Sequence, residues 1–143
     1  MKRPPAGAAQ IHIDGASRGN PGEAGFGIHV ADERGETLAE LYGYLGRATN
    51  NVAEYQALIH ALRWGKRHGL PEVSLFSDSE LVVKQMNGQY RVKHPDMLPL
   101  HREAQILMRG FAKASLSHVR REQNRDADRL ANLALDRKSS QLD

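Results

Sequence analysis

The chain has 143 residues and a formal net charge of +3, with 40% hydrophobic and 26% charged residues and no cysteine. This length suits one domain with a substantial core, the composition is that of a globular protein rather than a disordered or fibrous one, and the lack of cysteine excludes disulfide and thiol chemistry. No apolar run is long enough to cross a membrane, and the N-terminal MKRPPAGAAQ lacks the apolar segment of a secretory signal, so we expect a cytoplasmic protein. The net positive charge favours a polyanionic partner.

The first half of the chain is predicted to form three strands and one helix. After a flexible tail at residues 1–9, apolar and polar residues alternate with the period of half-buried strands. The strands expected from this alternation cover residues 10–14, 24–32 and 37–46. Gly35, between the second and the third, favours an antiparallel meander. The period then becomes helical over residues 51–68, and Gly69 followed by Pro71 is typical of a helix end.

In the second half, strands are predicted to alternate with helices. The expected order is a strand at 72–77, a short helix from 78 to 87, a helical stretch at 95–114, a strand at 115–119 and a last helix at 124–138. The end of the chain, residues 139–143, reads as a flexible tail. Three antiparallel strands followed by this alternation predict an α/β fold with a five-stranded mixed sheet flanked by helices, as one domain over residues 10–138.

Several carboxylates fall at the ends of these predicted elements. Asp14 closes the first strand, Glu54 lies in the first turn of the first helix, and Asp78 follows the fourth strand. The first turn of the last helix carries both Asp126 and Asp128, and periodicity does not choose between them. Carboxylates that converge on one edge of a sheet repel one another unless a cation neutralises them. Oxygen ligands without His or Cys indicate Mg²⁺ or Mn²⁺.

Each carboxylate also has an ordinary structural explanation, which is the more frequent one for an isolated residue. Asp14, placed before a glycine, suits an Asx-type turn. Glu54 follows Asn51 by three residues and suits a capping box, whereas Asp78 with Ser79 suits a helix N-cap. Acidic residues in the first turn of the last helix are favoured by the helix dipole. Only as a group do these residues indicate a metal site.

Four segments, read together, carry a more specific pattern. They are IDGASRGNPGEAGFG, RATNNVAEYQALIHAL, LFSDSELVVKQMNG and HVRREQNRDADRLANLA, and they extend over most of the chain, from Gln10 to about Ala134. In this order and spacing they resemble the four signature blocks of type I ribonuclease H, in its compact bacterial and archaeal form. The resemblance implies a ribonuclease H-like fold and an endoribonuclease that hydrolyses the RNA strand of RNA/DNA hybrids.

The resemblance assigns the family's catalytic and metal-binding quartet to Asp14, Glu54, Asp78 and Asp128. The last of these follows Asn124 by four residues, as in the family's motif, and this match selects Asp128 over Asp126. In the family these groups hold two Mg²⁺ ions, one activating water and the other stabilising the leaving oxygen, and Mn²⁺ is the expected substitute. The implied products carry 5′-phosphate and 3′-hydroxyl ends.

Substrate contacts are also implied. An enzyme that cuts RNA and spares DNA needs polar groups for the 2′-hydroxyl in the minor groove of an A-like duplex. Asn20, Asn50 and Asn51 match the family's groove-contacting positions, although turn and cap chemistry explains them equally. The resemblance further implies that Arg47, Thr49 and the backbone near Asn50 bind a phosphate of the DNA strand.

Besides Glu80, where some relatives have an amide, the chain departs from the family pattern in two places. Many relatives carry a Gly-His pair in the loop before the last helix, where the His assists proton transfer or product departure, and this chain has RREQ. His118 lies just upstream in a predicted strand, where a histidine is more often structural, and Arg121 or water is the alternative. The basic helix of larger relatives is missing between Met86 and Pro99. We therefore expect a slower enzyme with weaker, more salt-sensitive binding.

The expected partner is an RNA/DNA hybrid, with double-stranded RNA as a second candidate, and the expected state is a monomer. The competing hypothesis is a hybrid-binding module of the same fold with weak or no cleavage. It ranks second because a protein that only binds has no physical need for a cluster of like charges. A nuclease acting on DNA alone is a third hypothesis, which the amides expected at the 2′-hydroxyl disfavour.

Overall fold

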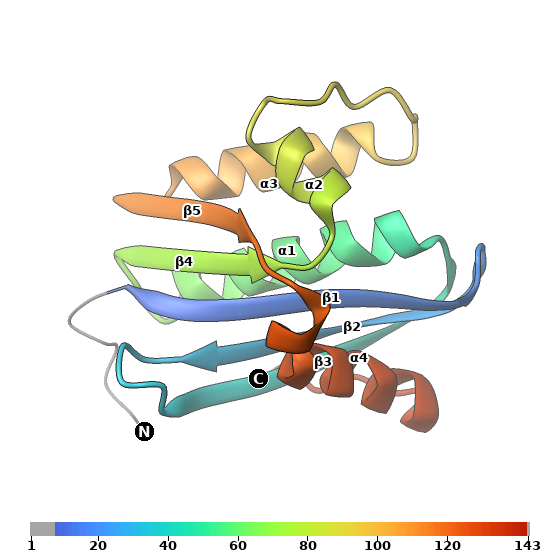
Figure 1. Ribbon diagram of the computed structural model, residues 1–143, viewed down its shortest axis with the longest axis horizontal. Helices are drawn as coiled ribbons and strands as arrows, with labels where there is room; N and C mark the ends of the chain where they lie inside the picture. The colour runs from blue at the N-terminus through green and yellow to red at the C-terminus, as the bar shows by residue number, and fades with distance from the viewer. Residues whose placement is uncertain (1–7, 143) are drawn as a thin grey trace.

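The computed structural model describes residues 8–142, which form a five-stranded sheet with helices on both faces (Figure 1). The strands are β1 (Ala9–Gly19), β2 (Gly22–Ala31), β3 (Thr37–Ala48), β4 (Glu72–Ser77) and β5 (Lys113–His118). Their order in the sheet is β3-β2-β1-β4-β5. β1 to β3 pair in antiparallel fashion, β4 is parallel to β1, and β5 is parallel to β4. The predicted mixed sheet is confirmed.

The helices cover the sheet unequally. They are α1 (Asn50–Arg67), α2 (Glu80–Met86), α3 (Leu98–Arg109) and α4 (Arg125–Arg137), with a 3₁₀ turn η1 (Arg121–Gln123) before α4. α1, backed by α3, packs on one face of the sheet and α4 on the other (Figure 1). Because side chains alternate along a strand, Ile11 and Ile13 enter the core under α1, whereas His12 and Asp14 turn to the α4 face. Among residues 8–142, no helix has the length and apolar character that a membrane span requires.

β1 is longer than predicted, and its extra residues change where Asp14 lies. It continues past Asp14 to Gly19, and its last residues pair with β2 up to Gly19 opposite Gly22. Asp14 therefore lies inside a strand, opposite Gly27, and its expected place at a strand end is wrong. The Gly, Ala and Ser residues that indicated a turn are small residues of a paired strand, and the turn itself falls at Asn20 and Pro21.

The helical stretch expected at 95–114 is also too long. α3 ends at Arg109 with Gly110 as its C-cap, and β5 already begins at Lys113, which pairs with Glu72 of β4. Apolar periodicity continued through this junction, but the backbone groups of the last residues are satisfied by the neighbouring strand. The strand predicted at 115–119 is confirmed, with a start two residues earlier at Lys113.

Ser140 and Gln141, in the segment after α4, pair with β3. Gln141 and Tyr42 of β3 exchange two backbone hydrogen bonds of 3.0 and 2.8 Å, and the Ser140 hydroxyl accepts a hydrogen bond of 2.9 Å from the Tyr44 N–H. These contacts cover part of the exposed edge of β3. Residues 1–7 of the expected N-terminal tail, and residue 143, lie outside the described residues, whereas Ala9 is buried at the start of β1.

Candidate active site

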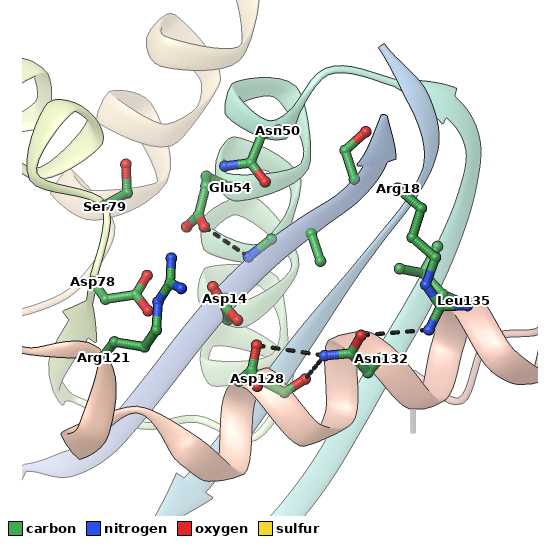
Figure 2. A pocket seen from close by; sticks show the side chains of 13 residues that line it. Asp14, Arg18, Asn50, Glu54, Asp78, Ser79, Arg121, Asp128, Asn132 and Leu135 are labelled. Atoms are coloured by element: carbon green, nitrogen blue, oxygen red, sulfur yellow. Dashed lines mark hydrogen bonds between the residues drawn. The ribbon is translucent and has the colours of Figure 1, made fainter. Parts of the chain in front are cut away.

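Four structural elements bring the predicted carboxylates to one cleft of about 330 Å³ (Figure 2). The residues are Asp14 of β1, Glu54 of α1, Asp78 directly after β4, and Asp128 of α4. Oxygen atoms of Asp14, Glu54 and Asp78 lie within 4.8 Å of one another. Asp128 lines the same cleft, next to Asp14, and it contributes to raising the pKa of Asp14. Residues far apart in the sequence therefore form one acidic cluster.

The place of Glu54 follows from the end of the parallel strand pair. β4 pairs with β1 only as far as Ser77 opposite Ile13. Beyond this pair, the next backbone N–H on that side of β1 has no strand partner. That donor, the N–H of Gly15, gives a hydrogen bond of 2.9 Å to Oε1 of Glu54. The Ser77 hydroxyl donates to Oε2 at 3.4 Å. Glu54, only 2% exposed, is thereby fixed where the two strands part.

The ordinary explanations of two carboxylates are wrong. The N-cap of α1 is Thr49, whose side chain accepts a hydrogen bond from the N–H of Val52, so Glu54 belongs to no capping box. The N-cap of α2 is Ser79 rather than Asp78. Asp78 is thus free to point into the cleft, as Figure 2 shows.

The structure also separates the two acidic residues at the start of α4. Asp128 lines the cleft, and Asn132 one turn later donates to its carbonyl oxygen at 3.0 Å and to Oδ1 at 3.4 Å. Asp126 instead lies 3.9 Å from the ring of His29, outside the cleft. The match to the family motif and the geometry select the same residue.

Replacing Gly15 by Ala is expected to destabilise the protein by about 1–3 kcal/mol. A Cβ atom at this position would lie 2.3 Å from the backbone N of Glu54 and 2.5 Å from the carbonyl C of Ala53, so α1 would have to move. Thermal unfolding followed by circular dichroism measures the effect, with Gln10→Ala at an exposed position of β1 as the control. An unchanged melting temperature for Gly15→Ala would contradict the close approach of β1 and α1.

Burial and mutual repulsion make the carboxylates of the acidic cluster harder to ionise. Burial, then the charges of Glu54 and Asp78, raise the pKa of Asp14 well above its ordinary value. Burial also raises the pKa of Glu54, against the lowering effect of the Gly15 N–H. Metal-free protein therefore resists full ionisation of the cluster at neutral pH, and a bound cation relieves this. A set of oxygen donors only, gathered in an open cleft, fits Mg²⁺ or Mn²⁺.

Of the auxiliary candidates, Arg121 and Asn124 lie near the carboxylates. Arg121 of η1 lines the cleft, and its guanidinium extends between Asp78 and Asp14 in Figure 2. Asn124 is buried, donates to the carbonyl oxygen of Ile13 at 2.9 Å, and so ties the start of α4 to the strand that carries Asp14. Its Oδ1 atom has no hydrogen-bond partner. His118, at the end of β5, is exposed and does not line the cleft.

Three of the five residues expected to contact substrate line the cleft or the depression beside it. Asn50 lines the cleft, and its N–H donates to the Asn20 side chain at 3.1 Å, which connects the β1–β2 turn to the start of α1. Arg47 and Thr49 line a neighbouring depression of about 680 Å³. Asn51 lines neither of these two hollows.

Three supporting residues were not predicted. Gly15 and Ser77 hold Glu54, and Asn132 holds Asp128. The spacing of Asn132, four residues after Asp128 on a helix, is a signal that the sequence does contain. The roles of Gly15 and Ser77 depend on where the β1–β4 pairing stops, which no local pattern encodes.

The sheet order and the carboxylates on it define a ribonuclease H-like protein. A family model described as reverse transcriptase-like matches residues 12–134. Ribonuclease HI of Halobacterium salinarum is 44% identical over 130 residues, which are 91% of this chain and 65% of that relative. A crystal structure of RNase H1 from that archaeon, also 44% identical, aligns with a TM-score of 0.88 over 92% of this chain and 99% of its own. The chain belongs to the type I ribonuclease H family.

Two further relatives extend the comparison. The bifunctional protein Rv2228c of Mycobacterium tuberculosis is 48% identical over 127 residues, which are 88% of this chain but only 35% of that protein. This chain thus spans about a third of the longer relative. The crystal structure of LC11-RNase H1 in complex with RNA/DNA hybrid is 41% identical, with a TM-score of 0.86 over 91% of this chain and 98% of its own.

Proposed function

We propose that this chain is a metal-dependent endoribonuclease that hydrolyses the RNA strand of RNA/DNA hybrids and leaves 5′-phosphate and 3′-hydroxyl ends. The observation that carries the proposal is the convergence of four carboxylates from four elements on one open cleft. Relatives support it, since one is named ribonuclease HI and another was solved in complex with an RNA/DNA hybrid.

Asp14, Glu54, Asp78 and Asp128 would hold two Mg²⁺ ions, or Mn²⁺ in their place. Bound there, the ions supply an activated water and stabilise the leaving oxygen. Glu54 is fixed from behind by Gly15 and Ser77 and serves as a rigid anchor. Asp78 is less buried and points into the cleft, so it can contact the metals on the side where the scissile phosphate enters.

Substrate choice is assigned to the rim of the cleft. Asn20 and Asn50 present polar groups beside the carboxylates, with Asn51 next along α1, and these suit the 2′-hydroxyls of the RNA strand. Arg47 and Thr49, in the adjoining depression, suit a phosphate of the DNA strand. Arg121 places a positive charge in the cleft. Of the two tasks of the mobile His in many relatives, we assign Arg121 the assistance to product departure, because a guanidinium is not a proton-transfer group.

The test is cleavage by metal-depleted protein of an RNA/DNA hybrid labelled on each strand in turn, with Mg²⁺, Mn²⁺ or EDTA. We expect the RNA strand to be cut only with metal, and the DNA strand to stay intact. Duplex DNA, duplex RNA and single strands serve as comparison substrates. Hybrid that is bound, as followed by fluorescence anisotropy, but uncut with either metal would favour the binding module. Cleavage of duplex DNA would favour a nuclease with a different task.

A further inference from the structure

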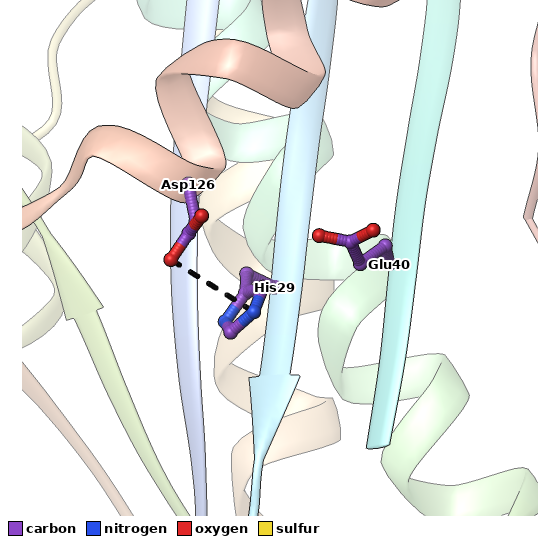
Figure 3. A group of neighbouring side chains, drawn as sticks. All are labelled: His29, Glu40 and Asp126. Carbon is purple, nitrogen blue, oxygen red and sulfur yellow. Dashed lines mark ion pairs between the residues drawn. The ribbon is translucent and has the colours of Figure 1, made fainter. Parts of the chain in front are cut away.

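We propose that His29, Glu40 and Asp126 form a second metal site, separate from the catalytic cleft, which binds Zn²⁺ (Figure 3). The three residues come from three elements on the α4 face of the sheet. The β2–β3 register sets His29 directly opposite Glu40, and the first turn of α4 places Asp126 over them. One ligand atom from each residue lies within 4.8 Å of the other two.

The distances leave space for an ion. His29 Nε2 is 3.9 Å from Oδ2 of Asp126, which is too long for a hydrogen bond. The same nitrogen lies 3.1 Å from the Thr37 hydroxyl, and a bound ion would replace that hydrogen bond. Ligand atoms lie about 2.0–2.2 Å from a zinc ion. Two such atoms on one tetrahedral ion therefore stand a little closer together than His29 and Asp126 do, and a small rotation of the half-exposed Asp126 side chain closes the difference.

The donor set favours Zn²⁺ over Mg²⁺. One imidazole and two carboxylates supply one nitrogen and two oxygen ligands. Zn²⁺ binds such a mixed set, whereas Mg²⁺ prefers oxygen ligands only. The catalytic cluster, by contrast, contains oxygen donors only. The two sites should therefore be selective for different ions, although Asp126 and Asp128 share one helical turn.

The ion pairs of Arg129 with Glu40 and Asp126 do not prevent Zn²⁺ from binding at this second site. Arg129 forms ion pairs with Oε2 of Glu40 and, at 3.5 Å, with Oδ1 of Asp126, so Oδ2 of Asp126 stays directed at His29. The Arg129 side chain is 52% exposed, and an ion pair this accessible to water costs little to rearrange.

The test is a titration of metal-depleted protein with Zn²⁺ in excess Mg²⁺, by isothermal calorimetry, in an Asp78→Asn background that impairs the catalytic cluster. We expect one zinc equivalent, and His29→Gln should weaken its binding by more than about tenfold. Arg129→Gln should strengthen binding, because it removes a competing positive charge without removing a ligand. Equal zinc affinity in the His29→Gln protein and its parent would overturn the proposal.

A second readout covers the case in which His29→Gln folds poorly. Glu40→Gln changes a partly exposed side chain near the sheet edge and should also weaken zinc binding. In the unsubstituted protein, the imidazole NMR signals of His29 should shift on addition of one zinc equivalent, and those of the exposed His94 should not. A shift confined to other histidines would overturn the assignment.

Discussion

Asp78→Asn is expected to reduce metal-dependent cleavage of an RNA/DNA hybrid by on the order of 10³-fold or more. The substitution keeps the size of the side chain but removes one negative charge from three carboxylates whose oxygen atoms lie within 4.8 Å. A neutral amide holds Mg²⁺ poorly, so the loss should fall on the chemical step. Initial rates at saturating Mg²⁺ measure it, and anisotropy with the same labelled hybrid should show that binding is retained.

Asp126→Asn is the matched control for this prediction. It makes the same chemical change, but Asp126 faces His29 and not the cleft. In buffers that contain Mg²⁺ and no transition metal, cleavage by Asp126→Asn should stay close to that of the unsubstituted protein. If both variants lost activity equally, the effect would come from net charge, and the assignment of Asp78 to the metal cluster would be contradicted.

Much of the acidic cluster was predictable from the sequence, because its members stand in four motifs whose order and spacing are specific. Local physics alone was not sufficient. It offered caps and turns for the same residues, and it left Asp126 and Asp128 equivalent. The geometry separates these two because α4 lies across β1 and β2, which turns one residue to Asp14 and the other to His29. That crossing is a tertiary property.

The fold class was also predictable, whereas several boundaries were not. Strand alternation identified the meander, but the small residues after Asp14 indicated a turn, and only pairing with β2 extends β1 to Gly19. The same holds at Lys113, where pairing with β4 ends the helical pattern. Gln141 pairs with Tyr42 of β3, from the first third of the chain, and no periodicity in the sequence indicates that contact. Backbone pairing between strands, which side-chain periodicity does not report, decided each of these cases.

Asp14→Asn is expected to raise the melting temperature of the metal-free protein at neutral and alkaline pH. Burial and the neighbouring Glu54 and Asp78 raise the Asp14 pKa in the folded state above its value in the unfolded chain. The folded protein thus binds this proton more tightly, and its stability is full at a pH below the unfolded pKa of about 4 and falls as pH rises through the folded value. The amide of the variant does not ionise, so the variant avoids this loss. Thermal scans in EDTA from pH 4 to 9 measure the difference, which should grow with pH.

Two further measurements test whether the stability change arises in the acidic cluster: stabilisation by Mg²⁺, and the melting temperature of Glu54→Gln. Mg²⁺ binds the folded state and should stabilise the unsubstituted protein more than Asp14→Asn, because the variant lacks one charged ligand. Glu54→Gln should gain less than Asp14→Asn in the metal-free protein, because hydrogen bonds from Gly15 and Ser77 already oppose the rise in the Glu54 pKa. Glu122→Gln, which removes an exposed charge, should not show the growth with pH. If Asp14→Asn melted below the unsubstituted protein at pH 9 in EDTA, repulsion in the cluster would not be what limits metal-free stability. We therefore expect the acidic cluster to lower the stability of the metal-free protein, and the thermal scans measure this effect.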